Sequence, residues 1–168
     1  MAGLITLGLS LIKVGEATKD SSKVPAEMNK IGKTYKDTCK LNQEPSEVTE
    51  HYEEGMAAPE VSKKNKKIPL LNFSIMDPDP QALADYVGGT VTDNEDGTKS
   101  WDFDGDEVVE NKAIYVDTEQ GLDFFIPNGS IEAVVNFDIS AKGIGLVDFT
   151  ITPMAVDTGK AIRAITKK

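Results

Sequence analysis

Hydrophobic and polar residues alternate along the C-terminal part of the chain, most regularly between residues 131 and 152. The apolar positions of this pattern are Ile131, Ala133, Val135, Phe137, Ile139, Val147, Phe149 and Ile151. The positions between them are mostly polar: Glu132, Asn136, Asp138, Ser140, Asp148, Thr150 and Thr152. Successive side chains of a strand point to opposite faces. The pattern therefore predicts an antiparallel sheet with one apolar face and one polar, largely acidic face.

Shorter patterns of the same kind predict further strands over residues 4–14, 32–43, 48–53, 68–76, 112–118 and 122–126. A short helix is expected over residues 81–87, because Asp79 can cap it, Pro80 suits its first position and Gly88-Gly89 ends it. Gly-containing pairs at 96–97, 128–129 and 142–143 predict turns between the later strands. The fold class expected is mainly β: an antiparallel β-sandwich or barrel with one short flanking α-helix and a long exposed loop.

A chain of 168 residues favours one domain over residues 1–168. Within it we expect an N-terminal strand or arm at 1–14, the long exposed loop at 55–67 and a basic C-terminal tail at 157–168. No stretch approaches the ~20 consecutive apolar residues of a membrane span, so no membrane partner is expected. The single cysteine, Cys39, cannot form an intramolecular disulfide, and its alternating neighbours favour a small buried side chain.

The charge is unevenly distributed. The net charge is −10, from 18 basic and 28 acidic residues. Residues 1–67 carry eleven lysines and ten acids, whereas residues 68–168 carry seven basic and eighteen acidic residues. The predicted sheet is therefore strongly acidic, and an acidic surface repels the phosphates of nucleic acid. A protein that recognises DNA or RNA is disfavoured.

The sequence offers no motif that predicts catalysis. It contains no P-loop, dinucleotide fingerprint or nucleophile elbow, and His51 has no partner that the sequence places beside it. Because the chain has 28 acidic residues, the presence of two carboxylates neither supports nor excludes a catalytic pair. We expect a protein that is not an enzyme and takes no cofactor.

An acidic segment from Asp93 to Glu110 raises the question of a calcium site, since that ion binds carboxylates in flexible loops. A helix–loop–helix calcium loop places its glycine at the sixth position. With Gly97 or Gly105 there, the first ligand would be Thr92 or Ser100, neither of them acidic. A solvated acidic hairpin is favoured, with a bound cation as the alternative.

Two segments resemble the tail tube proteins of tailed bacteriophages, which are related to the tubes of contractile injection and type VI secretion systems. They are IGKTYKDTCKLNQEPSEVTEHYEEG (residues 31–55) and FDISAKGIGLVDFTITPM (residues 137–154), with LITLGLSLIKV (residues 4–14) in the place of the N-terminal strand of that family. The segment from Asp93 to Glu110 departs from the family pattern. The resemblance implies a structural protein of the virion tail, present in the host cytoplasm during assembly.

The resemblance also implies how such a chain would assemble. Copies would form hexameric rings that stack into a hollow tube through which DNA passes without specific binding. The other expected partners are tape-measure, tail terminator and baseplate or tail-tip proteins. The basic cluster of residues 63–67 fits this picture as a loop that docks on an acidic surface of an identical neighbour.

Two sets of residues carry this hypothesis. The residues expected to face the lumen, with the outer surface as the alternative, are Glu132, Asn136, Asp138, Asp148, Thr150 and Thr152. The residues expected in contacts between rings or subunits are Glu44, Glu47, Glu53, Glu54, Lys63, Lys64, Lys66 and Lys67. The alternatives are a tube subunit of a contractile injection or secretion system, or a monomeric acidic β-sandwich that serves as a binding module.

Overall fold

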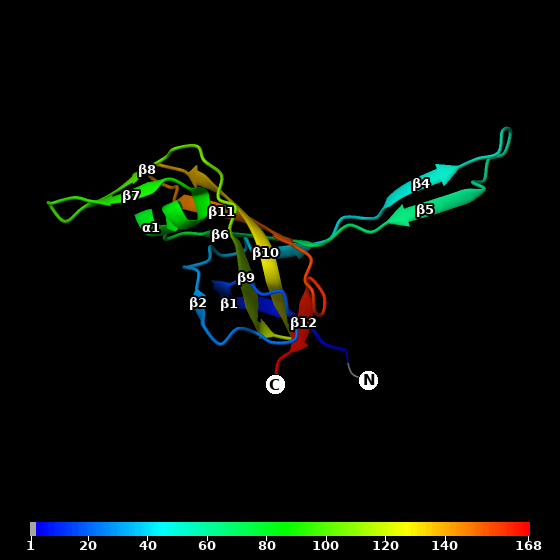
Figure 1. Ribbon diagram of the computed structural model, residues 1–168, viewed down its shortest axis with the longest axis horizontal. Coiled ribbons are helices and arrows are strands. Elements are labelled where there is room, and N and C mark those ends of the chain that lie inside the picture. The colour runs from blue at the N-terminus through cyan, green and yellow to red at the C-terminus, as the bar shows by residue number, and fades with distance from the viewer. Residues whose placement is uncertain (1–2) are drawn as a thin grey trace.

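The structure is a computed structural model that describes residues 3–168 (Figure 1). Its strands are β1 (Leu7–Glu16), β2 (Met28–Lys30), β3 (Lys40–Asn42), β4 (Glu47–His51), β5 (Val61–Asn65), β6 (Leu70–Ile75), β7 (Thr90–Asp93), β8 (Lys99–Asp102), β9 (Asn111–Gln120), β10 (Leu122–Phe137), β11 (Gly145–Pro153) and β12 (Arg163–Thr166). The helical segment consists of α1 (Pro80–Ala82) and the π-helical turn η1 (Leu83–Val87). The predicted fold class, mainly β and antiparallel with one short helix, is confirmed.

Eight strands form one antiparallel sheet in the order β2-β1-β9-β10-β11-β6-β3, with β12 paired to β10. The long strand β10 joins two halves of this sheet. Its first part pairs with β9 and β12, and its second part, from Gly129 to Phe137, pairs with β11. The sheet folds over itself along β10, so that the first part of β1, which β2 does not cover, faces the segment leading into the end strand β3 across an open side.

The turn predicted at Asn128-Gly129 is absent, because both residues lie inside β10. The register between β9 and β10 shifts between Ile126 and Gly129, which marks a bulge. The Asn128 side chain is buried there and donates to the carbonyl of Ala155, at 3.2 Å. A Cβ on Gly129 would lie 2.7 Å from a methyl group of Ile151. The glycine thus serves close packing in this strand instead of a turn.

The hydrophobic core lies between the two halves of the folded sheet. Phe73 of β6 stacks on Phe149 of β11, with ring centroids 4.9 Å apart. Tyr86 of η1 meets the Phe149 ring edge-on at 5.2 Å, so the helical segment covers that end of the core. The helix begins as predicted, since the Asp79 carboxylate accepts a hydrogen bond from the Ala82 amide at 2.8 Å.

Several predicted elements have different limits. Only residues 40–42 of the expected strand 32–43 form a strand, β3. The expected N-terminal strand at 1–14 is β1, which begins at Leu7; residues 1–2 lie outside the described part of the chain. The basic tail at 157–168 contains strand β12, which the sequence pattern did not indicate. No helix among residues 3–168 is long and apolar enough to cross a membrane.

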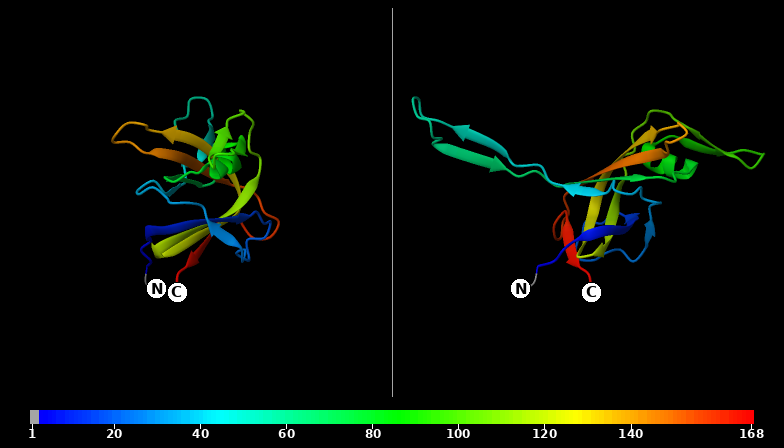
Figure 2. Two further views of the ribbon diagram at one scale, coloured as in Figure 1. Left: turned by 90° about the vertical axis from the view of Figure 1, so that its left-hand side faces the viewer. Right: turned by 180° about the vertical axis from the view of Figure 1, so that it is seen from behind.

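The largest difference concerns the segment 55–67, where a loop without regular structure was expected. Residues 61–65 instead form β5, which pairs with β4 in a two-stranded hairpin. We call residues 44–67 the arm. It projects from the sheet on one side, and the β7–β8 hairpin projects on the opposite side (Figures 1 and 2). Every residue of β4 and β5 is exposed.

Candidate assembly surfaces

Most of the residues expected to face a lumen share one face of the sheet. On β10 and β11, Glu132 pairs with Thr150 and Ser130 pairs with Thr152. Directly paired residues of an antiparallel sheet lie on the same face. Asp148 lies on this face too, since it is two residues from Thr150. We call this surface, with Asn136, Asn72 and Ser74 added, the polar face.

Hydrogen bonds between side chains order the polar face. The Asp148 carboxylate accepts one from Asn136 at 3.0 Å and a second from the Ser74 hydroxyl. The Thr150 hydroxyl donates to the Asn72 side chain at 3.0 Å. These contacts link side chains of three neighbouring strands, β6, β10 and β11, across the polar face.

Asp138 is separate from this face. It lies in the turn between β10 and β11, where its carboxylate accepts a hydrogen bond from the Ser140 amide at 3.1 Å. The Ser140 hydrogen bonds lower the pKa of Asp138. The structure therefore brings together five of the six residues expected on a common face and places the sixth at the tip of the hairpin.

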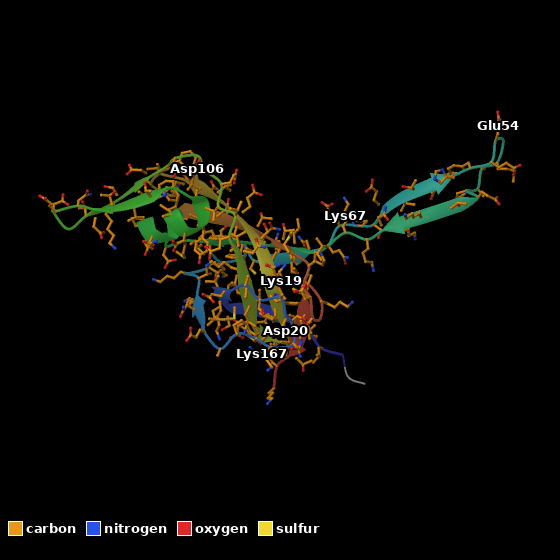
Figure 3. The ribbon with its side chains drawn as sticks, in the orientation of Figure 1. Lys19, Asp20, Glu54, Lys67, Asp106 and Lys167 are labelled. Atoms are coloured by element: carbon orange, nitrogen blue, oxygen red, sulfur yellow. The ribbon has the colours of Figure 1, made fainter. Side chains whose placement is uncertain are left out.

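The eight residues expected in contacts between subunits all lie on the arm. Glu54 is near its tip and Lys67 is at its base (Figure 3). At the base, the Lys67 ammonium contacts the Glu44 carboxylate at 2.9 Å, and the Gln43 side chain donates to the Lys67 carbonyl at 2.8 Å. The hydrogen bond with Lys67 lowers the pKa of Glu44, and the same contact raises the pKa of Lys67. These contacts close the base of the arm.

The rest of the arm separates its charges along its length. Lys63 lies opposite Thr49 and Lys64 lies opposite Val48, in the half near the body. The far half carries the acids Glu50, Glu53, Glu54 and Glu60. The arm also exposes four apolar or aromatic side chains, each more than 45% accessible: Val48, Tyr52, Met56 and Val61. A surface of this composition on a segment without a core is suited to a protein partner.

The outer part of β10 is a second uncovered surface, which the sequence pattern did not identify as such. Beyond Ser130, β11 pairs with one edge of β10, and no strand among residues 3–168 pairs with the other. Val135 and Phe137 were expected to face the core, yet each is 47% exposed, and Ile139 is 91% exposed. The core ends near Ala133, but the apolar alternation continues past it. The outer part of β10 thus leaves apolar side chains exposed in the single chain.

A groove of about 700 Å³ lies on the open side of the sheet. Its walls are residues 6–10 of β1 and the segment before it, and residues 33–41 leading into β3. Its apolar lining comes mainly from Leu9, Cys39, Leu41, Leu71, Val116 and Phe124. Burial raises the pKa of the Cys39 thiol to about 11, so this cysteine is suited to packing and poorly suited to nucleophilic chemistry.

The remaining candidate residues are the acidic segment and His51. No group of three or more His, Cys, Asp or Glu residues within 3–168 is arranged to hold a metal ion. The acidic residues between 93 and 110 lie along β7, β8 and the connection to β9, and Asp96 and Asp104 accept hydrogen bonds from their own turns. His51 is exposed on the arm opposite Val61.

No protein-family model and no curated protein matches the chain. Among solved structures, the chain is similar to a chain in the cryo-EM structure of the anti-feeding prophage (AFP) baseplate, 6-fold symmetrised. The TM-score is 0.50 at 13% sequence identity, and the match covers 99% of this chain and 98% of that chain. At this identity the similarity concerns the fold. The two chains therefore share a fold over nearly their full lengths.

Proposed function

We propose that this chain is a structural subunit that assembles with copies of itself into stacked rings, which form the hollow tube of a phage-like tail. One observation carries the proposal: the isolated chain leaves uncovered an apolar strand edge and a two-stranded arm. Soluble monomers protect such edges with charges, bulges or covering loops. A subunit instead covers them with its neighbours.

The contact within a ring uses the outer part of β10. The neighbouring subunit supplies hydrogen bonds to the unpaired edge beyond Ser130 and covers Val135 and Phe137. Strand addition at an exposed edge is a common mode of protein association. The contact joins unlike surfaces of identical subunits, so it closes into a ring or continues as a helix. The 6-fold symmetry of the similar assembly favours a hexameric ring.

The contact between rings uses the arm. None of its strand residues contributes to the core of its own subunit, so its exposed side chains are available to a subunit of the next ring. Tape-measure, tail terminator and baseplate or tail-tip proteins would then contact only the ends or the interior of the tube. We place the protein in the virion tail, and in the host cytoplasm during assembly.

The polar face lines the lumen in this proposal. Glu132 and Asp148 give it negative charge, Thr150 is hydrogen-bonded to Asn72, and Asn136 is hydrogen-bonded to Asp148. DNA phosphates are repelled from such a surface over a Debye length of about 8 Å at physiological salt. The polymer would therefore pass without adhering.

A second candidate function is the tube of a contractile injection system, where a protein replaces DNA as cargo. The anti-feeding prophage named for the similar structure favours it over an ordinary tail. The two candidates share subunit, ring and tube and differ in what fills the lumen. Identification of the proteins that copurify with tubes from the native source distinguishes them, since a tail that conducts DNA contains only structural tail proteins, whereas an injection tube also contains a cargo protein.

Negative-stain electron microscopy of the concentrated protein, beside a variant without the arm, tests the proposal. In the variant, a short Gly-Ser linker replaces residues 45–66, which is feasible because the Glu44 and Lys67 side chains already meet at 2.9 Å. We expect rings and tubes from the natural chain, and a folded variant that forms no tubes. Removing the β7–β8 hairpin tip, residues 94–98, is the control and should leave tubes intact.

Two results would contradict the proposal. Tubes formed by the armless variant would remove the arm from the contact between rings. A natural chain that stays monomeric at every concentration and salt condition would favour the monomeric binding module instead.

A further inference from the structure

The groove on the open side of the sheet has the features of a receptor for an extended segment. Along its first wall, β1 pairs with β9 on one edge, while β2 covers the other edge only from Lys13 onward. Along its second wall, β3 pairs with β6 on one edge, and no strand among residues 3–168 covers its other edge. Backbone hydrogen-bonding groups of two strands are thus available beside an apolar floor.

The rim of the groove is basic, although the chain as a whole is acidic. It carries Lys30, Lys33 and Lys36 against two acids, Asp37 and Glu119. The whole chain has a net charge of −10, so a net positive groove is a local reversal. The groove therefore fits an acidic segment that also carries apolar side chains.

The tip of the arm has the complementary composition. Residues 50–60 contain four glutamates and no lysine or arginine, and they expose Tyr52 and Met56 at 54% and 58%. Two-stranded hairpins are marginally stable alone in water. The arm begins two residues after β3 and projects away from its own sheet, so its tip is presented to another molecule (Figures 1 and 3).

We propose that the arm tip of one subunit, residues 50–60, docks in the groove between β1 and residues 33–41 of a second copy. The inference rests on the proposed self-assembly and specifies its contact between rings. Met56 and Tyr52 enter the apolar floor, and the glutamates of the tip meet Lys33 and Lys36 at the rim. Because tip and groove lie on different parts of the chain, each subunit donates one arm and accepts one, which propagates a stack.

Cysteine cross-linking in assembled full-length protein tests the docking directly. In a Cys39→Ala background, Tyr35→Cys places a thiol on the groove and Met56→Cys places one on the tip; both natural side chains are exposed. Under oxidation we expect a ladder of dimers, trimers and longer covalent chains, since every subunit carries both partners. The matched control replaces Tyr35→Cys with Lys142→Cys, an exposed turn residue away from the groove.

The control should give no ladder, and a ladder of equal intensity in it would overturn the docking. Tubes in which the Tyr35/Met56 pair gives no ladder would also overturn it, while leaving the proposed function intact. Protein that never assembles would overturn both, so the two failures are distinguishable.

Charge reversal supplies an independent measurement. Lys33→Glu with Lys36→Glu should raise the concentration needed for assembly at low salt by about tenfold or more, because like charges would then face each other. Adding Glu53→Lys and Glu54→Lys should restore most of the loss, whereas the two tip reversals alone should weaken assembly. Failure of the combined variant to recover would overturn the pairing of these surfaces.

Discussion

At the scale of single residues, the most constrained polar group is the carboxylate of Asp123, which is 7% exposed on β10. It accepts hydrogen bonds from the Thr118 amide at 2.9 Å and from the Tyr115 hydroxyl at 2.8 Å. Lys167, near the C-terminus, contacts Asp117 and lies 3.5 Å from Asp123. Burial alone would raise the pKa of Asp123, but these hydrogen bonds outweigh it and lower that pKa. The cluster ties β12 to the β9–β10 hairpin.

Alkaline pH should loosen this cluster through Tyr115. Burial and the hydrogen bond to Asp123 raise the pKa of Tyr115 to about 12, against about 10 in the unfolded chain. The stabilisation is therefore complete below about pH 10 and is lost as the pH rises toward about 12. We expect Tyr115→Phe to reduce this alkaline loss of unfolding free energy by roughly 1 kcal/mol. The effect is no larger because solvent screens the partly exposed ring.

Denaturant unfolding of both proteins at neutral pH and at about pH 11 measures the effect. The informative quantity is the difference between their two pH dependences, since Lys167 loses its charge in the same range and does so in both. Equal pH dependences in Tyr115→Phe and the natural chain would show that the hydrogen bond does not persist in solution.

At the scale of elements, substitutions in the outer part of β10 should affect assembly while changing the folding of the single chain little. Val135 and Phe137 lie on the core-facing side but beyond the core, whereas Val134 lies on the polar face with 51% exposure. A charge at any of these positions stays in water in the monomer, so it should change the free energy of unfolding by only about 0.5 kcal/mol.

We expect Val135→Lys to abolish ring formation, because it places a charge in the proposed contact with the neighbouring subunit. Val134→Lys is the matched control: it has the same side chain and a similar exposure but points to the opposite face. Sedimentation velocity and electron microscopy compare the two variants. Loss of assembly in both, or in neither, would contradict the assignment of this edge to the interface.

At the scale of the whole molecule, stability should depend on protein concentration. The arm and residues 132–137 of β10 add no buried side chain to the isolated chain, so assembly contributes stability that the monomer lacks. Association stabilises the folded state by mass action. We expect the Tm of the natural chain to rise with concentration by several degrees across the assembly threshold.

The armless variant and Val135→Lys should each show a Tm that does not change with concentration. Scanning calorimetry over a wide concentration range makes this comparison. A Tm of the natural chain that stays constant while tubes persist up to the unfolding transition would contradict this expectation.

The sequence alone determined the fold class and the strands of the core. Alternation with a period of two predicted β11 and the outer part of β10, since Val147, Phe149 and Ile151 are buried and the residues between them lie on the other face. The helix was equally readable, because Asp79 and Pro80 act through contacts a few residues away. Strand alternation and helix capping both depend on residues close together in the chain, so they can be predicted from the sequence alone.

Only the tertiary structure decided which apolar residues have a partner to pack against. Val135 and Phe137 continue the same alternation as Ile131, yet the opposite half of the sheet ends before it reaches them. Asn128-Gly129 has the sequence of a turn, but close packing against Ile151 keeps it within a strand. The arm, the groove and its lysines likewise depend on where distant segments end relative to one another. Local periodicity sets the direction of each side chain, and the spatial extent of the core determines what each side chain meets.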